Sequence, residues 1–281
     1  MRFTRFVAVD WTGAKGLRHR AIQAAEADAG DGPPRLIRPG HRWSRTEIAE
    51  MIDDIAARGE PTLIGIDCSF SLPFVDEGAY FPGDAQEPSG PRALWAEIDR
   101  VAAAEPDLAA HPYIDARRRH FWCGAADGVQ RNYSRLRLPE ALHRERRMGN
   151  PCSPYVLVGA SQVGKATLSG MRLLSRVNIP IWPFDPMPAT GALLVEIYCQ
   201  TFAVDGGFRG KLRTRARLNE ALTRIGSKPA TDLPDQFDDH VGDALVSAAG
   251  LRRAAADSAY WHPAPMTPEV ARTEGWTFGI L

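Results

Sequence analysis

Two short runs of the sequence decide the fold. Residues 5–10 read RFVAVD, and residues 62–67 read TLIGID. Each run is almost continuously apolar and ends in an aspartate, Asp10 in the first and Asp67 in the second. Strands that are buried on both faces show such continuous apolar runs, whereas half-exposed strands alternate. The two runs therefore predict central strands of an α/β sheet, each with a carboxylate at its end.

Further predicted strands and helices, bounded by turn and capping residues, surround these two runs. Residues 17–26 and 35–37 are weaker strand candidates, separated by a Gly- and Pro-rich turn. Ser44 and Glu47 have the spacing of a capping box, which predicts the start of a helix. Further strand-like runs occupy residues 155–158, 179–184 and 193–198, and helical patterns occupy residues 91–104, 138–147, 163–177, 211–225 and 237–256.

The chain is expected to form one domain over residues 1–281. Residues 74–150 differ in texture, being rich in Pro, Gly, Arg and aromatic residues. They predict a mostly helical, Arg-rich insertion within that domain. The Pro-rich tail after Tyr260 is expected to wrap the surface.

Composition narrows the class of protein. The 281 residues include 34 basic and 34 acidic side chains, so the formal net charge is zero, which argues against indiscriminate coating of nucleic acid. The longest apolar runs fall short of the roughly 20 residues that a membrane helix needs, and the start lacks a signal-peptide pattern. The four cysteines are scattered without a CxxC motif, which favours free thiols in a reducing cytoplasm: Cys68, Cys123, Cys152 and Cys199.

Acidic residues at special positions are the candidates for chemistry. Asp10 and Asp67 end the two apolar strands, Glu196 interrupts the run LLVEIY, and Asp239 and Asp243 lie four residues apart on one helix face. Taken singly, each has an ordinary explanation as a turn residue, an outward-facing side chain or a helix cap. A carboxylate within an apolar strand is nevertheless costly to desolvate unless a cation or a reaction uses its charge.

Convergence of these acids would create a site for divalent cations. Hard oxygen ligands favour Mg²⁺ or Mn²⁺, and a pair of such ions can clamp a phosphodiester. The predicted catalytic residues are Asp10, Asp67, Glu196 and Asp243, and the predicted metal ligands are Asp10, Asp67, Asp239 and Asp243.

Four motifs carry a resemblance to a known family. They are VAVDWTG (7–13), LIGIDCSFSLP (63–73), LLVEIYCQTF (193–202) and DDHVGDALVSA (238–248). These segments and their order resemble the domain-of-unknown-function family 429, whose members are described as predicted nucleases of RNase H-like fold. The chain departs from the family pattern where prolines commonly follow the Glu196 and Asp67 positions. The resemblance implies a mixed sheet flanked by helices.

The resemblance also implies roles for the acids. Asp10 would bridge two metal ions, Asp67 would occupy the second acid position, and Asp243 would hold the metal beside the attacking water. Glu196 would be an additional ligand or a base. The last motif also resembles the terminal helix of Holliday-junction resolvases, which makes His240, or Asp239 beside it, a possible fourth ligand.

Basic residues suggest a surface for nucleic acid. Between His111 and Arg147 the sequence has nine arginines and four acids, interleaved with aromatic residues. Arg117, Arg118 and Arg119, together with Lys165, are the predicted phosphate contacts, since such clusters grip backbones and stack bases. The alternative is that these arginines are solvated and paired with nearby acids.

A near-match to a phosphate-binding loop spans residues 159–167. The sequence GASQVGKAT places Ala166 where GxxxxGK[ST] needs a hydroxyl, and Thr167 comes one residue late. That shift rotates the hydroxyl by about 100° around a helix. The motif therefore departs from a true phosphate-binding loop.

The leading hypothesis from the acids and the family resemblance is a cytoplasmic Mg²⁺- or Mn²⁺-dependent nuclease of RNase H-like fold. The alternatives are a catalytically silent binding module of that fold and, with less support, a nucleotide-binding phosphotransferase.

Overall fold

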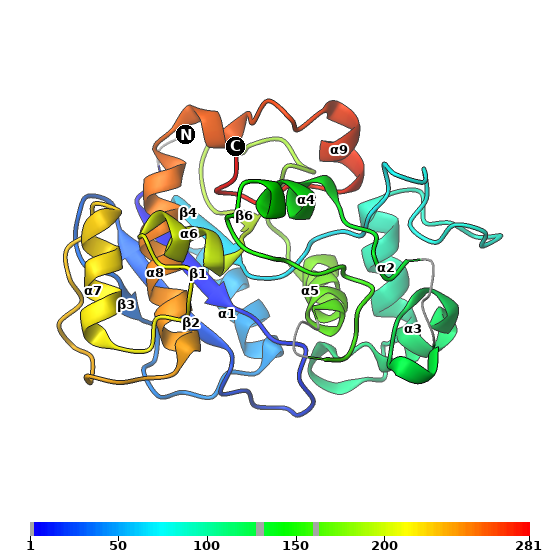
Figure 1. The fold of residues 1–281 in the computed structure, drawn as a ribbon, viewed down its shortest axis with the longest axis horizontal. Coiled ribbons are helices and arrows are strands. Elements are labelled where there is room, and N and C mark those ends of the chain that lie inside the picture. Colours follow the sequence, from blue (N-terminus) through cyan, green and yellow to red (C-terminus); the bar gives the residue numbers. More distant parts are fainter. Residues whose placement is uncertain (1–2, 128–131, 160–162) are drawn as a thin grey trace.

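A mixed six-stranded sheet forms the centre of the protein (Figure 1). The computed structural model describes residues 3–127, 132–159 and 163–281. The strand order is β3-β2-β1-β4-β6-β5. The parallel strands are β1 (Arg5–Asp10), β4 (Thr62–Ile66), β6 (Leu193–Glu196) and β5 (Ile181–Trp182), while β2 (Gln23–Asp28) runs antiparallel to β1 and β3 (Arg35–Leu36) antiparallel to β2. The predicted α/β class is confirmed.

The register of the two central strands brings their carboxyl ends together. Val9 of β1 pairs with Ile66 of β4, and the amide of Asp67 donates to the carbonyl of Val9 at 3.0 Å. Every residue of β4 is buried, as the continuous apolar run predicts for a central strand. Asp10 and Asp67 therefore lie side by side at the carboxyl ends of adjacent strands.

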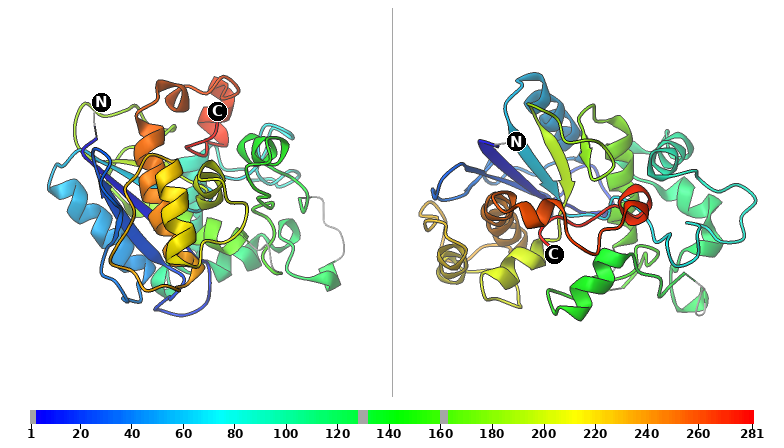
Figure 2. Two further views of the ribbon diagram at one scale, coloured as in Figure 1. Left: turned by 60° about the vertical axis from the view of Figure 1, so that its left-hand side comes forward. Right: turned by 90° about the horizontal axis from the view of Figure 1, so that it is seen from above.

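Helices cover both faces of the sheet (Figure 2). One face packs against α1 (Arg45–Ala57), α5 (Gly164–Arg176) and α2 (Pro91–Val101), and the other against α6 (Cys199–Asp205), α7 (Arg215–Arg224) and α8 (Asp239–Ala255). The predicted capping box of α1 is present, since the Ser44 hydroxyl accepts from the Glu47 amide at 3.0 Å and Glu47 accepts from the Ser44 amide at 2.8 Å. No helix in the described ranges has the length and apolar character needed to cross a bilayer.

Residues 74–150 are built from helices and turns wherever the structure describes them. They contain α2, α3 (His111–Ala116) and α4 (Leu138–Glu145), together with short 3₁₀ turns: Pro106–Leu108, Arg118–His120 and Ala125–Asp127. The strand predicted at residues 155–158 is absent as such. Val156 forms only a single bridge with Trp122, because the segment meets no longer extended partner there.

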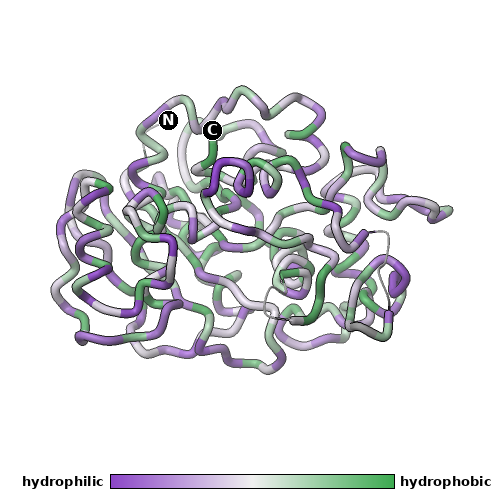
Figure 3. The backbone as a smooth tube through the Cα atoms, in the orientation of Figure 1, coloured by the Kyte–Doolittle hydropathy of each residue, from purple (hydrophilic) through white to green (hydrophobic). Residues whose placement is uncertain are grey.

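The tail after Tyr260 differs from its prediction. After a 3₁₀ turn (Ser258–Trp261) and α9 (Pro268–Thr273), the chain turns inward and buries Trp276, Phe278 and Ile280. The amide of Phe278 donates to the carbonyl of Glu196 at 2.8 Å, which attaches the tail to β6. The last residues before the C-terminus are correspondingly coloured as hydrophobic in Figure 3. The prolines predict a tail on the surface, but burial of the alternating apolar residues that follow them is more favourable and draws the tail inward.

Candidate metal centre

Two aspartates and a cysteine converge at the carboxyl edge of the sheet. One ligand atom from each of Asp10, Asp67 and Cys199 lies within 4.8 Å of the other two. Asp10 is 7% exposed and Cys199 is 2% exposed, so the group is held inside the protein surface. Cys199 is the first residue of α6, three residues beyond the end of β6. The three residues thus come from three neighbouring strand ends.

Helix α8 adds the next layer of charged groups. His240 Nδ1 lies 2.8 Å from Oδ2 of Asp10. Asp243, one turn further along α8, accepts from Nζ of Lys211 at 2.6 Å, and the same ammonium lies 3.5 Å from Asp239. The predicted acids at positions 10, 67, 239 and 243 therefore occupy one neighbourhood.

A glycine lets the Lys211 loop approach α8 so closely. A Cβ atom on Gly242 would lie 2.0 Å from the carbonyl oxygen of Leu212, so no other residue fits at this position without a backbone shift. The helix predicted over residues 211–225 begins only at Arg215, after the Thr214 N-cap. Lys211 is consequently free to reach into the acid cluster from a loop.

The cluster holds more negative charge than its cations neutralise. Burial, opposed by the hydrogen bond from His240 and reinforced by Asp243, raises the pKa of Asp10 to about 6. Burial and the charge of Asp10 raise the pKa of Asp67 to about 8. Burial also raises the pKa of Asp243, despite its ion pair with Lys211. A bound cation would relieve this repulsion and favour the ionised carboxylates.

Glu196 lies on the opposite face of the sheet. The parallel register pairs Ile66 with Glu196, so the residue beside Asp67 is Ile197. Since neighbouring residues on a strand point to opposite faces, the one-residue offset sends Glu196 away from Asp10 and Asp67. Glu196 is 2% exposed and is surrounded by other partners.

Those partners use every acceptor position of the Glu196 carboxylate. Arg137 donates at 2.5 and 2.8 Å, the Phe70 amide at 2.7 Å and the Thr277 hydroxyl at 2.6 Å. A carboxylate has about four lone-pair sites, so no oxygen remains for a metal or for a proton in transit. We therefore leave Glu196 out of the candidate site, in contrast to the sequence-based prediction of a ligand or base.

The predicted arginine contacts to nucleic acid are also occupied. Arg117 and Arg119 both pair with Asp84, and Arg118 lies 2.5 Å from Asp127. These pairs lie within the insertion and neutralise the positive charge that a phosphate backbone would need. The structure thus favours the alternative in which these arginines pair with nearby acids. Arg131, another member of the basic run, lies outside the described residues.

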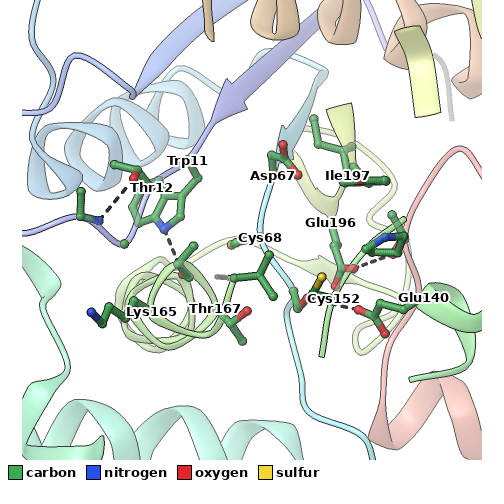
Figure 4. A pocket seen from close by; sticks show the side chains of 18 of the residues that line it. Trp11, Thr12, Asp67, Cys68, Glu140, Cys152, Lys165, Thr167, Glu196 and Ile197 are labelled. Atoms are coloured by element: carbon green, nitrogen blue, oxygen red, sulfur yellow. Dashed lines mark hydrogen bonds between the residues drawn. The ribbon is translucent and has the colours of Figure 1, made fainter. Parts of the chain in front are cut away.

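A cavity of about 530 Å³ adjoins the acid cluster (Figure 4). Asp67 and Tyr198 belong to its lining, as do Thr12 and the helical residues Lys165 and Thr167. Residues 160–162 of the phosphate-loop-like motif lie outside the described part of the chain. The Thr167 hydroxyl is buried and finds no hydrogen-bond partner among the described residues, so it does not serve the helix itself.

No protein family, curated protein or solved structure matched the chain.

Two residues of the acid cluster, Cys199 and Lys211, were not predicted from the sequence. Cys199 lies inside a quoted motif, and its position just beyond the end of β6 could have marked it as a neighbour of Asp67. Lys211 gave no such signal, because its role depends on a loop that the sequence pattern predicts as helix.

Proposed function

We propose that this chain is a metal-dependent hydrolase of phosphodiester bonds in nucleic acid, built on an RNase H-like arrangement. The observation that carries the proposal is the meeting of Asp10 and Asp67 beside Asp243. None of these three pairs with an arginine among the described residues, although Arg213 lies 3.3 Å from Asp239 at the margin of the site. The order of elements supports the same arrangement. An acid-tipped strand is followed by two antiparallel strands, a helix, a second acid-tipped strand and a late helix that bears acids.

The donor set fits a divalent cation. The carboxylates of Asp10, Asp67 and Asp243 would hold it, with Asp239 and His240 at the margin of the site. Carboxylate oxygens are the usual ligands of Mg²⁺ and Mn²⁺. The Cys199 thiol is a softer donor, so we expect Mn²⁺ to bind more tightly than Mg²⁺. When bound, such ions stabilise the charge on the attacking and leaving oxygens of a phosphodiester.

The surrounding residues prepare the acids for this task. His240, whose pKa is raised by its hydrogen bond to Asp10, keeps a proton on Nδ1 and orients the Asp10 carboxylate. Until a metal binds, Lys211 neutralises Asp243 through its 2.6 Å contact, so the ammonium group and a metal ion would compete for this carboxylate. Burial of Asp10 and Asp243 limits the access of water, which strengthens each of these interactions.

Cleavage assays test the proposal directly. The full chain would be incubated with Mn²⁺ and end-labelled single-stranded DNA, duplex DNA and RNA. We expect Mn²⁺-dependent cleavage of at least one substrate and a loss of about 1,000-fold or more in Asp10→Asn, which removes one ligand charge. Asp28→Asn is the matched control, because Asp28 also ends a strand but is exposed and paired with Arg35.

Two results would overturn the proposal. One is equal cleavage by the wild type and Asp10→Asn, which would place the activity elsewhere. The other is nucleic-acid binding without cleavage in Mn²⁺, which would favour the catalytically silent binding module.

A further inference from the structure

The cavity beside Asp67 has walls that the fold holds rigidly. The loop after β1 lies against the first turn of α5, where a Cβ atom on Gly13 would come within 2.3 Å of the backbone of Lys165 and Ala166. The indole of Trp11 donates to the Ala166 carbonyl at 3.2 Å and to the Ser169 hydroxyl at 3.0 Å. The loop and the helix therefore form one fixed wall of the cavity; Figure 4 shows Trp11 and Thr12 beside the turn of α5 that carries Lys165.

Lysine is rare in this chain, and two of the lysines line this cavity. The sequence has four lysines against thirty arginines. Lys211 pairs with Asp243 in the acid cluster, and Lys228 pairs with Asp31 at 3.2 Å. Lys15 and Lys165 line the cavity, and neither forms an ion pair within residues 3–127, 132–159 and 163–281. Two unpaired ammonium groups on one cavity wall favour an anionic ligand.

A buried hydroxyl on the same wall also lacks a partner. Thr167 is fully buried and lines the cavity, yet its hydroxyl makes no hydrogen bond within the part of the chain that the structure describes. The oxygen atom itself is closed to solvent, so it does not contact the space of the cavity. Helix α5 has thirteen residues and no side-chain cap, which leaves the positive end of its dipole facing the same region.

The remaining walls suit the apolar part of a ligand. Trp11, Ile197 and Tyr198 contribute apolar and aromatic surface, and Asp67 connects the cavity to the acid cluster. Glu140 and Glu196 also line the cavity, but Arg137 pairs with both of these carboxylates. A volume of about 530 Å³ lies within the usual range for small-molecule sites and is too small for a duplex. The cavity thus combines an anion-attracting wall, an aromatic wall and an opening to the candidate metal centre.

We propose that this cavity binds a single nucleotide, with its phosphate held by Lys15, Lys165 and the first turn of α5. The substrate would then be an unpaired nucleotide, either at a strand end or in a single strand, that reaches the acid cluster through Asp67. The choice of substrate rests on the proposed function, whereas binding of the nucleotide itself does not.

Equilibrium binding of adenosine 5′-monophosphate to the full chain, in EDTA, tests this inference. Calorimetry should show saturable binding in the micromolar to millimolar range. We expect Lys165→Ala to weaken it about tenfold, and adenosine without phosphate to bind about tenfold more weakly than the monophosphate. Lys228→Ala, which removes a paired surface lysine, is the control and should bind as the wild type does.

Thr167→Val keeps the shape of the side chain and removes only the unpaired hydroxyl. It should leave the melting temperature unchanged or slightly raised and bind the monophosphate as the wild type does, because this hydroxyl is closed to the cavity. The inference is overturned if the wild type shows no saturable binding of the monophosphate, or if Lys165→Ala binds it equally well. Inorganic phosphate that binds as tightly as the monophosphate would also refute a nucleotide site.

Because the binding assay is carried out in EDTA, without metal, its outcome can be distinguished from that of the cleavage assay. Asp10→Asn should bind adenosine 5′-monophosphate in EDTA as the wild type does, even if it cleaves nothing. If the nuclease assay fails while nucleotide binding depends on Lys165, the cavity assignment stands and the hydrolase proposal falls. If cleavage occurs, a clear preference for single strands over duplex is the expected outcome, and equal cleavage of both contradicts the substrate assignment.

Discussion

Buried carboxylates on the two faces of one sheet edge have opposite surroundings. On one face, Glu196 is enclosed by Arg137 and two further donors that use all its lone pairs. On the other face, Asp10 and Asp67 meet beside a partly exposed lysine and a histidine, and both have raised pKa values. A carboxylate with its own arginine serves the structure. Asp10 and Asp67 have no arginine partner in the part of the chain that the structure describes, so they are suited to bind a cation that comes from solution.

The Glu196 face explains how distant segments hold the site in place. Arg137 is fully buried and also contacts Glu140 and the carbonyl of Glu274, which lies just after α9. Glu196 in turn accepts from the amide of Phe70, three residues after Asp67. The insertion, the C-terminal tail and the loop after β4 therefore meet at one ion pair. We infer that this ion pair positions the loop that carries Asp67.

The largest expected effect comes from breaking that ion pair. Arg137→Ala leaves two buried glutamates without their cation, so we expect the free energy of unfolding to fall by about 3–5 kcal/mol. Urea denaturation followed by circular dichroism measures the change. Arg118→Ala, which removes a partly exposed ion pair, is the control for loss of an arginine. A loss below about 1 kcal/mol in Arg137→Ala would show that Glu196 does not depend on this partner.

On the face of the sheet that carries Asp10 and Asp67, we expect removal of a charge to stabilise the protein. Asp67→Asn removes a repelled charge, so in EDTA at pH 8 it should stabilise the protein by about 1–2 kcal/mol while it abolishes metal binding. Because folding raises the pKa of Asp67 from 3.8 to about 8, the folded wild type binds the proton more tightly than the unfolded chain does. Its contribution to stability therefore falls as the pH rises from about 4 to 8.

Thermal melts across this pH range measure the difference between the two proteins. The advantage of Asp67→Asn over the wild type should grow with pH and then level off above the folded pKa. Saturating Mn²⁺ should reverse the order, because the wild type alone gains from the cation. A variant that is less stable than the wild type at pH 8 in EDTA would contradict the assignment of unrelieved repulsion.

A smaller effect is expected from the lysine that reaches into the acid cluster. Lys211 carries a positive charge among acids where a metal would bind, so the two cations compete. Lys211→Met should raise the affinity for Mn²⁺ about tenfold, as calorimetric titration would show. Lys228→Met controls for the loss of a lysine at the surface. A weaker affinity for Mn²⁺ would mean that Lys211 supports the ligands rather than competing with the metal.

The smallest effect is expected in the insertion. Arg118 is paired with Asp127, so Arg118→Ala should change the affinity for single-stranded DNA by less than about twofold and leave its salt dependence unaltered. Fluorescence anisotropy at several salt concentrations measures both quantities. A drop in the salt slope of about one unit would restore the insertion as a phosphate-binding surface.

The sequence predicts the sheet better than it predicts the partners of the acids. The apolar runs that end in Asp10 and Asp67 are enough to indicate central strands, and parallel strands bring their carboxyl ends to one edge. The face on which Glu196 lies depends on the register of β6 against β4, which no local pattern encodes. The pairing of Arg137 with Glu196 joins residues 59 positions apart and follows only from the folded chain.

Metal titration by electron paramagnetic resonance tests the central claim most directly. Free Mn²⁺ gives a sharp spectrum that weakens on binding, so the bound fraction can be followed for the full chain and for Asp10→Asn. We predict that the wild type binds Mn²⁺ with a dissociation constant below about 1 mM and that Asp10→Asn does not. A wild type that leaves Mn²⁺ free at millimolar concentration, or an Asp10→Asn variant that binds it equally well, would contradict the claim that these carboxylates form a cation site.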